Sequence, residues 1–296
     1  MRIGTRASAL ALAQAELVAA LLGGGEIVPV VTSGDRGEAS EDKSRWVSEL
    51  ERALVDGQLD LAVHSAKDVP SGLAEGLALV GTPPRAGAED VLCGARGIEA
   101  LAPGSRVGTS SIRRRAQLAA TREDLEVVSM RGNVDTRLAK LATGHVDALV
   151  LARAGLQRLG REDAIDAVLD PAWFVPAPGQ GTLALEARAE DQPVREALVG
   201  ICDTEAFRCL RAERALAGSL QASCHTPIGA HAEPCDGGLR LRAWVGLPDG
   251  SVWISDELAG EAGDPEALGR AVGARMKLAG AGAILAAAES MPAPAR

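Results

Sequence analysis

The stretch RVGTSSIRRRAQLAA, residues 106–120, contains one strand-to-helix unit. Its first part, Arg106–Thr109, predicts a short β-strand, and Ser110 or Ser111 can cap a helix over Ile112–Ala120. The same order of a short apolar run followed by a helical pattern recurs through the first two-thirds of the chain. This alternation predicts an α/β fold with a largely parallel sheet.

Outward from this unit, further short apolar runs predict strands: Arg2–Thr5, Ile27–Thr32, Leu59–His64, Leu77–Thr82, Asp90–Cys93, Leu125–Met130, Val146–Ala152 and Thr182–Ala187. Ser8 can cap a helix that Gly23–Gly25 ends, and Asn133 or Asp135 can start another through Leu141. Ala154–Leu159 predicts a further helix.

The last third of the chain has a different pattern. After about Asp203 it predicts a helix to Leu220, a hairpin of Leu239–Val245 and Ser251–Leu258, and one closing helix that begins at Asp264-Pro265. That order is typical of a small α+β domain.

The composition excludes several classes of protein. The 296 residues are 47% hydrophobic and 24% charged, which excludes a disordered or fibrous chain. Apolar stretches fall short of the ~20 residues that a membrane span needs. The first residues lack the pattern of a secretory signal, so we expect a soluble cytoplasmic protein. The net charge of −9 disfavours general binding to nucleic acid or to an anionic membrane.

The charge is unevenly distributed along the chain. Residues 106–161 hold ten Arg and one Lys against five acidic residues, a net charge of +6, so the remainder carries −15. Arginine stays charged, and its planar guanidinium binds carboxylates through two parallel hydrogen bonds. The segment therefore predicts a local site for a small polyanion with several carboxylates or phosphates. A nucleotide P-loop is not supported, because the sequence G-x-x-x-x-G-K-[ST] is absent.

Polar side chains follow several predicted strands at the point where each strand ends. In an open parallel sheet, ligands bind outside these carboxyl ends, where helix N-termini offer free N–H groups. Lys67-Asp68 follows one strand directly, and Pro70 fixes the turn. A carboxylate in a cationic pocket is suited to stabilise a cationic intermediate or to move a proton, although a Lys-Asp pair is more often a surface ion pair. His64 is expected to face the core.

Five cysteines, an odd number, argue against a disulfide framework. Cys224 lies in a loop of small residues closed by Pro227 and Gly229, so its thiol is a candidate for covalent function. Cys209 is expected in a helix and Cys93 in a strand core. A zinc module built from Cys202, Cys209, Cys224 and Cys235 with His225 and His231 is an alternative, but its spacing fits no standard zinc motif.

Several segments together resemble the hydroxymethylbilane synthase (porphobilinogen deaminase) family: Arg2–Arg6, His64–Pro70, Gly108–Arg114, Arg131–Arg137, Leu151–Gly160, Pro176–Gly181 and Cys224–Gly229. They occur in the family's order and span nearly the whole chain. The resemblance implies an α/β fold of two lobes like those of type II periplasmic binding proteins, with a double crossover and a small α+β C-terminal domain. The implied domains are 1–84 with 180–200, 85–179, and 201–296.

The resemblance also implies the reaction. The family joins porphobilinogen units, each with loss of ammonia, into the linear tetrapyrrole hydroxymethylbilane on a covalently attached dipyrromethane cofactor. Cys224 would hold the cofactor, and Asp68 would be the catalytic carboxylate. The implied positions for cofactor and substrate binding are Arg6, Ser8, Lys43, Lys67, Thr109, Ser111, Arg113, Arg114, Arg131, Arg137 and Arg158. No metal and no macromolecular partner is implied, and a monomer is expected.

The sequence departs from the family pattern at two places. Gly34–Trp46, where the family has a lid, is shorter and more acidic, and it contains Lys43. The cofactor cysteine is preceded by Ala222-Ser223 and followed by His225-Thr226. Two other readings stay open at this stage, a non-catalytic two-lobed polyanion-binding protein and a zinc-stabilised regulatory module. A binding protein has no use for both Asp68 and Cys224, and their joint presence favours catalysis.

Overall fold

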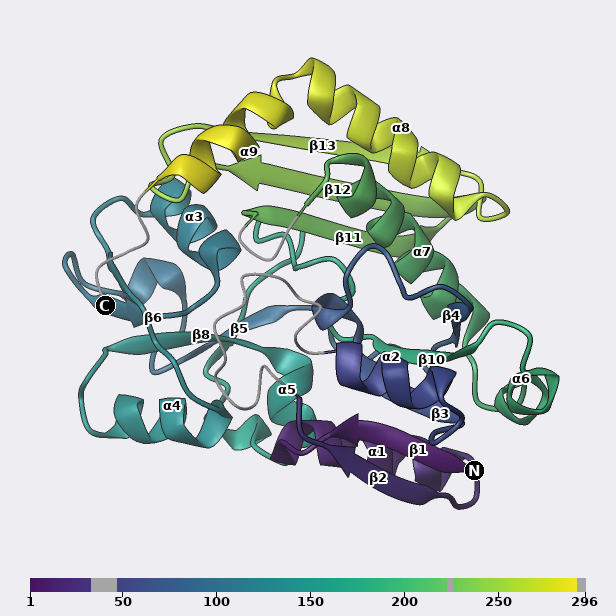
Figure 1. Ribbon diagram of the computed structural model, residues 1–296. Coiled ribbons are helices and arrows are strands. Elements are labelled where there is room, and N and C mark those ends of the chain that lie inside the picture. Colours follow the sequence, from purple (N-terminus) through teal and green to yellow (C-terminus); the bar gives the residue numbers. More distant parts are fainter. Residues whose placement is uncertain (33–46, 223–225, 292–296) are drawn as a thin grey trace.

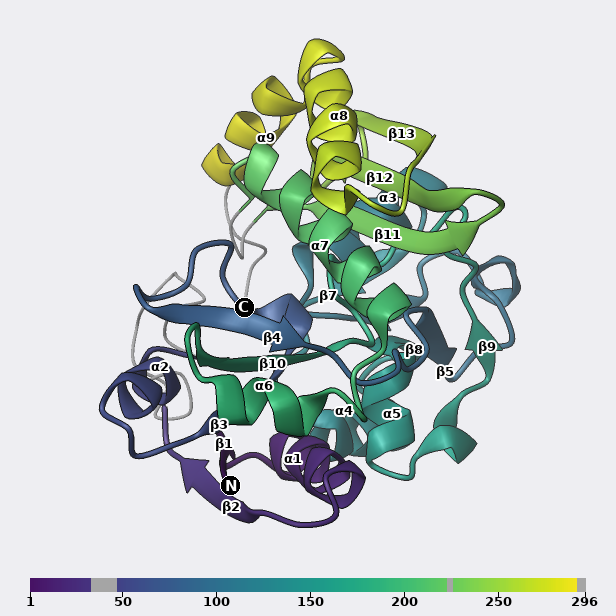
Figure 2. The same ribbon diagram turned by 90° about the vertical axis from the view of Figure 1, so that its right-hand side faces the viewer.

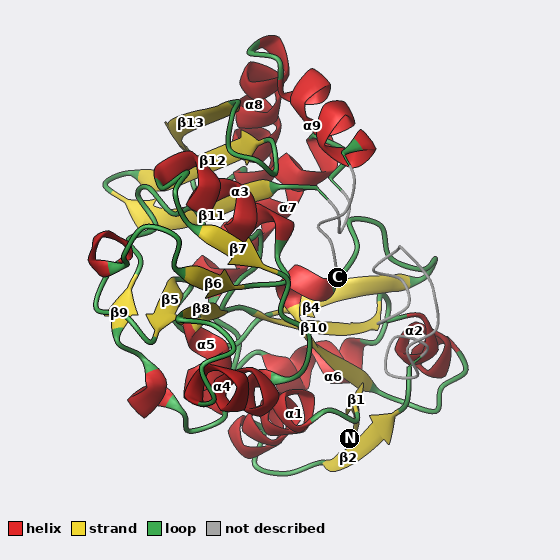
Figure 3. Ribbon diagram, turned by 90° about the vertical axis from the view of Figure 1, so that its left-hand side faces the viewer, coloured by secondary structure: helices red, strands yellow, loops and turns green. Residues whose placement is uncertain are grey.

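The computed structural model describes residues 1–32, 47–222 and 226–291. Its strands form three separate sheets (Figure 1). Two are five-stranded sheets of the first two-thirds of the chain, and the third is a three-stranded sheet near the C-terminus. Helices cover these sheets, as the colouring by secondary structure shows (Figure 3).

The first sheet has the strand order β2-β1-β3-β10-β4. Its strands are β1 (Arg2–Arg6), β2 (Glu26–Val30), β3 (Leu61–Ser65), β4 (Leu77–Gly81) and β10 (Leu183–Arg188). β1 pairs in parallel with β2 and β3, whereas β10 runs antiparallel to both β3 and β4. The helices of this part are α1 (Ala9–Leu21), α2 (Ser48–Val55) and α6 (Gln192–Leu198).

The second sheet has the order β7-β6-β8-β5-β9. Its strands are β5 (Asp90–Cys93), β6 (Arg106–Gly108), β7 (Glu126–Val128), β8 (Ala148–Ala152) and β9 (Ala167–Val168). Here β6 is parallel to β7 and β8, and β5 is antiparallel to β8 and β9. The helices are α3 (Ile112–Thr121), α4 (Val134–Ala142) and α5 (Arg153–Arg158).

Both sheets therefore follow one plan, in which the antiparallel strand is the one next to a crossing of the chain. The chain leaves the first sheet after β4 and enters the second with β5, and it returns after β9 to form β10. This double crossover between two α/β lobes, with a separate three-stranded sheet, confirms the predicted fold class. The prediction of a largely parallel sheet holds for all strands except β10 in the first sheet and β5 in the second, each of which is antiparallel to both of its neighbours.

The two crossing segments lie side by side. The amide of Ala86 donates to the carbonyl of Gly181 at 3.2 Å. Gly181 has a φ of +84°, and a Cβ there would meet the carbonyl oxygen of Ala86 at 2.5 Å. Glycine is thus required at this crossing both by the left-handed backbone and by the close approach.

Three predicted helix starts are observed with their side-chain caps. Ser8 accepts a hydrogen bond from the amide of Ala11, Ser111 from that of Arg114, and Asn133 from that of Thr136. Each cap satisfies one of the amides that a helix N-terminus leaves without an intrahelical partner. The caps also fix where strands β1, β6 and β7 give way to helices, which places polar residues at the carboxyl ends of these strands.

The third sheet has the order β11-β12-β13, and all its pairs are antiparallel. It consists of β11 (Ile228–Cys235), β12 (Gly238–Gly246) and β13 (Trp253–Gly260), and helices α7 (Thr204–Ser219), α8 (Pro265–Leu278) and α9 (Ala281–Ser290) lie against it (Figures 1 and 2).

The C-terminal part and the helices of the first sheet differ from what the sequence predicts. Strand β11 was not predicted, because its sequence IGAHAEPC contains Ala, Gly and Pro where strands usually have β-branched residues. The single predicted closing helix is two helices, separated at Gly280, whose φ is +102°. Helices α2 and α6 were also not predicted.

No single described helix is long and apolar enough to cross a membrane. Helices α8 and α9 satisfy the length and composition test only as a pair, and they are bent by 76° at their junction.

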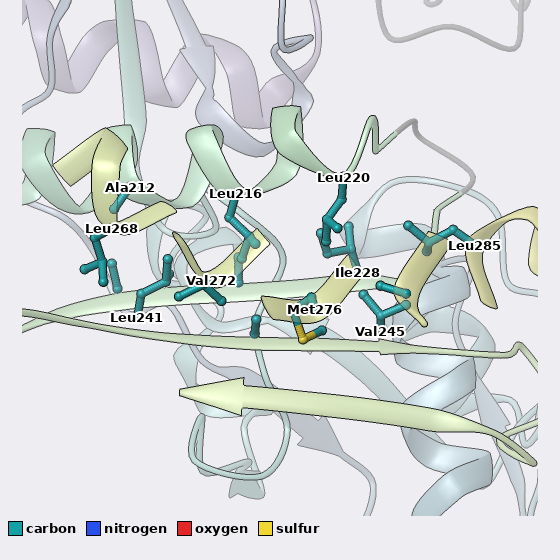
Figure 4. Close-up of a cluster of buried hydrophobic side chains, with 14 of the residues drawn as sticks. Ala212, Leu216, Leu220, Ile228, Leu241, Val245, Leu268, Val272, Met276 and Leu285 are labelled. Atoms are coloured by element: carbon teal, nitrogen blue, oxygen red, sulfur yellow. The ribbon is translucent and has the colours of Figure 1, made fainter. Parts of the chain in front are cut away.

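The largest buried cluster joins α7, α8 and α9 to the third sheet (Figure 4). Leu216 of α7, Leu241 of β12 and Val272 of α8 meet in it, and each is fully buried. Because α7 also lies next to the first sheet, this cluster fixes the helix that connects the two parts of the molecule.

We predict that Leu216→Ala lowers the free energy of unfolding by about 2–5 kcal/mol, because it removes buried contacts and leaves a cavity. Leu278 on α8 is 90% exposed and provides the control. Leu278→Ala should change the free energy of unfolding by less than about 0.5 kcal/mol. Urea-induced unfolding followed by circular dichroism measures both, and equal effects of the two substitutions would contradict the prediction.

Candidate functional site

The turn after β3 carries the Lys67-Asp68 pair. Residues Ala66–Asp68 form one 3₁₀ turn, closed by a hydrogen bond of 3.2 Å from the amide of Val69 to the carbonyl of Ala66. Ala66 and Val69 are buried, whereas Lys67 and Asp68 are half-buried. The turn thus anchors its apolar ends and directs its two charged residues to the carboxyl edge of the first sheet.

A small cavity of about 20 Å³ lies beside Asp68. Its lining includes Asp68, Arg6 at the end of β1, Ser65 at the end of β3, and Gln14 of α1. The Ser65 hydroxyl and the Gln14 amide are hydrogen-bonded at 2.9 Å. The cavity is large enough for about one water molecule and has several polar partners for it.

His64 also lines this cavity, and its position agrees with the expectation that it faces the core. It is 5% exposed, and its Nε2 lies 2.9 Å from Oε2 of Glu186 in the neighbouring strand β10. The imidazole and the carboxylate therefore form a buried pair directly behind the edge that carries Asp68.

Lys67 lies within electrostatic reach of groups from the second sheet. Its pKa is lowered from 10.5 to about 8, first by burial and then by the Arg114 guanidinium, while Asp68 and Asp90 act in the opposite direction. The carboxyl edges of the two sheets are therefore close enough for their charges to interact. The Lys67 ammonium remains the main form at neutral pH.

Asp90, at the start of β5, is the centre of a buried cluster of charges. Its Oδ1 accepts from Nε of Arg114 at 2.9 Å and from the Gln180 amide at 2.8 Å, and its Oδ2 lies 2.8 Å from Nη1 of Arg113. Burial alone would raise the pKa of Asp90, but the two guanidiniums outweigh it and lower the pKa to about 2. Asp90 is thus ionised and neutralises part of the arginine charge.

The guanidiniums of Arg113 and Arg114 form most of their contacts within this cluster and with nearby backbone carbonyls. Both are less than 10% exposed. Nη1 of Arg113 donates to the carbonyl of Val175 at 2.8 Å, and its guanidinium lies 5.9 Å from the centre of the Phe174 ring. Nη1 of Arg114 donates to the carbonyl of Val150 at 3.0 Å. Their predicted role in ligand binding therefore adds to a structural role that the sequence did not indicate.

The remaining predicted arginines are less constrained. Arg131 is exposed, and Arg137 is half-buried, with its Nε donating to the carbonyl of Gly132 at 2.9 Å. The pKa of Arg137 is lowered by burial and by the charge of Arg114. Helix α4, which carries Arg137, therefore lies within electrostatic reach of the Asp90 cluster. Arg158 of α5 donates to the carbonyl of Gly181 at 2.6 Å, and burial lowers its pKa to about 10.

Two models of known protein families match this chain. "Porphobilinogen deaminase, dipyromethane cofactor binding domain" matches residues 1–196, and "Porphobilinogen deaminase, C-terminal domain" matches residues 207–278.

The chain belongs to the porphobilinogen deaminase family.

Relatives in this family cover almost the full chain. A porphobilinogen deaminase of Thermus thermophilus is 43% identical over 277 residues, which are 90% of this chain and 92% of the relative. One of Deinococcus radiodurans is 42% identical over 301 residues, 96% of this chain and 97% of the relative. This chain is thus a member of a transferase family with a dipyrromethane cofactor-binding domain, as its sequence predicts.

Solved structures at low identity are also similar. A periplasmic substrate-binding protein of an ABC transporter from Coxiella burnetii has a TM-score of 0.41 and 13% identity, and it covers 68% of this chain and 91% of that protein.

Two residues expected to act in the porphobilinogen deaminase reaction, Lys43 and Cys224, lie outside the described residues. Ala222 and Thr226 are the described residues on either side of the cysteine loop, after α7 and before β11. Within residues 1–32, 47–222 and 226–291, no group of three or more His, Cys, Asp or Glu side chains could hold a metal ion.

Buried donor atoms in this part of the molecule fit an anionic cofactor. Nε of Arg113 and Nε of Arg158 are buried and have no hydrogen-bond partner among the described residues. A buried donor without a partner is costly, and a carboxylate is the kind of group that would satisfy it. The family's dipyrromethane, whose rings carry carboxylates, is therefore compatible with the residues present.

The residues that hold this site together, above all Asp90, Gln180 and Glu213, were not predicted from the sequence. Each had a signal. Asp90 begins an otherwise apolar strand, so its charge needed a buried partner. Glu213 is spaced by three residues from both Leu210 and Leu216 on the buried face of α7.

We predict that Asp90 makes folding pH-dependent. Its pKa in the folded protein, about 2, is below the ordinary 3.8, so the stabilisation is complete above about pH 4 and is lost as the pH falls through 2. Its size is about 2 kcal/mol. In Asp90→Asn this contribution is absent, so parent and variant should converge in stability as the solution is acidified.

Urea unfolding from pH 7 down to the lowest pH at which the parent folds measures this difference. Asp135→Asn is the control, because Asp135 forms an exposed ion pair with Arg161 and should matter by less than about 1 kcal/mol. If the difference in free energy of unfolding between the parent and Asp90→Asn does not change with pH, the pH dependence does not come from Asp90.

Proposed function

We propose that the protein joins porphobilinogen units, each with loss of ammonia, into hydroxymethylbilane, with Asp68 as the catalytic carboxylate and Cys224 as the attachment point of the dipyrromethane cofactor. Membership of the family supports the reaction. The observation that supports the assignment within this chain is the position of the Asp68 turn at the carboxyl edge of the first sheet, where Asp68 and Arg6 line the same cavity.

The arginines and hydroxyls supply the binding of carboxylates. Each porphobilinogen unit brings an acetate and a propionate, so negative charge accumulates as the product grows. Arg131 and Arg137 offer guanidiniums near the N-terminus of α4. The hydroxyls of Ser8, Thr109 and Ser111 accept hydrogen bonds from backbone amides, which leaves each hydroxyl proton available for a ligand oxygen.

Asp68 supplies the electrostatic and proton chemistry. Loss of ammonia from the aminomethyl group of porphobilinogen leaves a cation delocalised over its pyrrole ring. A carboxylate held at a partly desolvated edge stabilises that charge better than water does. The same oxygen atoms can accept the pyrrole N–H proton. When bound, dipyrromethane would supply the free pyrrole carbon to which the first unit is joined; this carbon loses its proton as the C–C bond forms, and the proton leaves with the departing ammonia as ammonium.

We also propose the three-domain division 1–84 with 180–200, 85–179 and 201–296, and a monomeric cytoplasmic protein with no nucleic-acid or membrane partner. The separation of the strands into three sheets supports the division. The net charge of −9, with positive charge concentrated in residues 106–161, supports a small anionic ligand rather than a polyanionic surface.

We predict that Asp68→Asn slows the addition of porphobilinogen by about 10²–10³-fold, because it keeps the shape and removes the charge. Asp68→Glu keeps the charge one methylene further out and should cost less. Single-turnover addition to cofactor-loaded protein, with loading checked by intact mass, measures both. Asp68 has no such role if the Asn variant is as fast as the parent or faster than the Glu variant.

We predict that Cys224→Ser removes the covalent dipyrrole, because a serine hydroxyl is a much weaker nucleophile than a thiolate. Intact mass and the colour with Ehrlich's reagent should both report its loss. Burial raises the pKa of Cys93 to about 11 and that of Cys209 to about 12, so these thiols stay protonated and unreactive.

The matched controls are serine substitutions of each other cysteine, Cys93, Cys202, Cys209 and Cys235, all of which should retain the cofactor. Peptide mapping that finds the dipyrrole on any of these four residues would exclude Cys224 as the attachment point.

A further inference from the structure

Helix α7 contacts the backbone just after the Asp68 turn through one side chain, Arg214. Nη2 of Arg214 donates to the carbonyl of Pro70 at 2.7 Å and to that of Ser71 at 3.1 Å. Nη1 donates to the carbonyl of Val69 at 3.3 Å. Three consecutive carbonyls are therefore held by one guanidinium, beginning at the residue next to Asp68.

Apolar packing holds the same turn against the same helix. Ala66 and Val69, on either side of the Lys67-Asp68 pair, form a buried cluster with Leu210, which precedes Arg214 by one helical turn. Phe207, a further turn back, packs against this cluster. The hydrogen bonds of Arg214 thus act on a segment that already docks on α7, and they set its position along the helix.

The residue before Arg214 holds the turn from its other side. Glu213 is fully buried and accepts from the amide of Gly179 at 2.6 Å. Gly179 lies directly on the turn, because a Cβ there would meet Ala66 and the backbone nitrogen of Lys67 at 3.0–3.1 Å. Two successive residues of α7 therefore fix the turn, one through the crossing segment and one through the carbonyls that follow Asp68.

Charge also favours this arrangement. Burial lowers the pKa of Arg214, and the carboxylate of Glu186 opposes that shift. The Arg214 guanidinium therefore has an attractive electrostatic interaction with the buried Glu186 in addition to its hydrogen bonds to three carbonyls. A neutral side chain of the same length would retain packing along its apolar stem and lose these interactions.

We propose that Arg214 is a positioning residue for the reaction: by holding the carbonyls of Val69, Pro70 and Ser71 it fixes the Asp68 carboxylate relative to α7. Helix α7 ends at Ser219, five residues before Cys224. The carboxylate and the cofactor cysteine are thereby attached to the same helix. This inference rests on the proposed role of Asp68 and assigns a function to a residue of the C-terminal part of the chain.

The test uses Arg214→Met and Arg214→Lys in full-length, cofactor-loaded protein. The Met variant should add porphobilinogen about ten-fold or more slowly, since displacement of a reacting group by a fraction of an ångström is costly. Its KM should stay within about two-fold of the parent, because no contact with the substrate is removed. The Lys variant keeps the charge and one group of donors and should lie between the two.

Arg211→Met is the matched control on the same helix. Arg211 is exposed and pairs with Glu266, so its loss should leave kcat and KM unchanged. Thermal unfolding of all variants separates slow chemistry from loss of folded protein. If Arg214→Met does not fold, Arg214→Lys carries the test.

The decisive measurement is a double-mutant cycle with Asp68→Asn. If Arg214 acts through the Asp68 carboxylate, Arg214→Met should have little further effect in the Asp68→Asn background. Full additivity of the two effects, or a parent-like kcat in both Arg214 variants, would overturn the proposal. An Asp68→Asn protein as fast as the parent would instead refute the proposed role of Asp68, and the two failures are therefore distinguishable.

Discussion

The structure depends on the junction where the two crossings of the chain meet α7. Arg85, in the first crossing, donates from Nε and Nη2 to the carbonyl of Gln180 in the second crossing. Its Nη1 lies 2.7 Å from Glu213 of α7, which also accepts from the amide of Ala232 in β11. One guanidinium and one fully buried carboxylate thus join the two crossings and the third sheet. A buried carboxylate is tolerated here because every side of it meets a donor.

This junction explains how positive charge is divided between structure and ligand binding. Arg85 is used to join segments, and Arg113 and Arg114 share Asp90. A single carboxylate compensates only part of that pair, and the excess positive charge extends to Lys67, whose pKa it helps to lower. An anionic ligand bound nearby would favour the protonated ammonium again. The site thus combines paired buried charges, Arg113 and Arg114 with Asp90, with Lys67, whose pKa would change when an anionic ligand binds.

The sequence was sufficient for many of the local elements, because strand runs, caps and helix starts depend on neighbouring residues. Ser8, Ser111 and Asn133 were assigned as possible caps, and all three are caps. It also identified the Asp68 turn, since Pro70 and the preceding strand are local signals. It did not identify Asp90 and Glu213 as charge centres, because their partners lie far away in sequence: Asp90 contacts Gln180, ninety positions later.

Strand β11 is a second element that depends on residues far away in the sequence, here through packing. Its residues Ile228, Ala230 and Ala232 are buried in the cluster that α7 and α8 share with the third sheet, and the whole segment pairs with β12. Propensity alone did not indicate a strand here. Whether this segment forms a strand depends on its contacts with β12 and α7, which are not visible in the local sequence pattern.

The third sheet contacts both five-stranded parts of the molecule. Toward the first sheet, α7 packs Leu210 on Ala66 and Val69. Toward the second, Trp244 of β12 is buried with Ala116 of α3, on the helix that carries Arg113 and Arg114. The C-terminal part, in which Cys224 is the proposed attachment point of the cofactor, therefore contacts both the Asp68 turn and the helix that carries Arg113 and Arg114. If Cys224 holds the cofactor, as proposed above, the turn that carries Asp68 and the helix that carries Arg113 and Arg114 are both packed against the part of the chain to which the cofactor is attached.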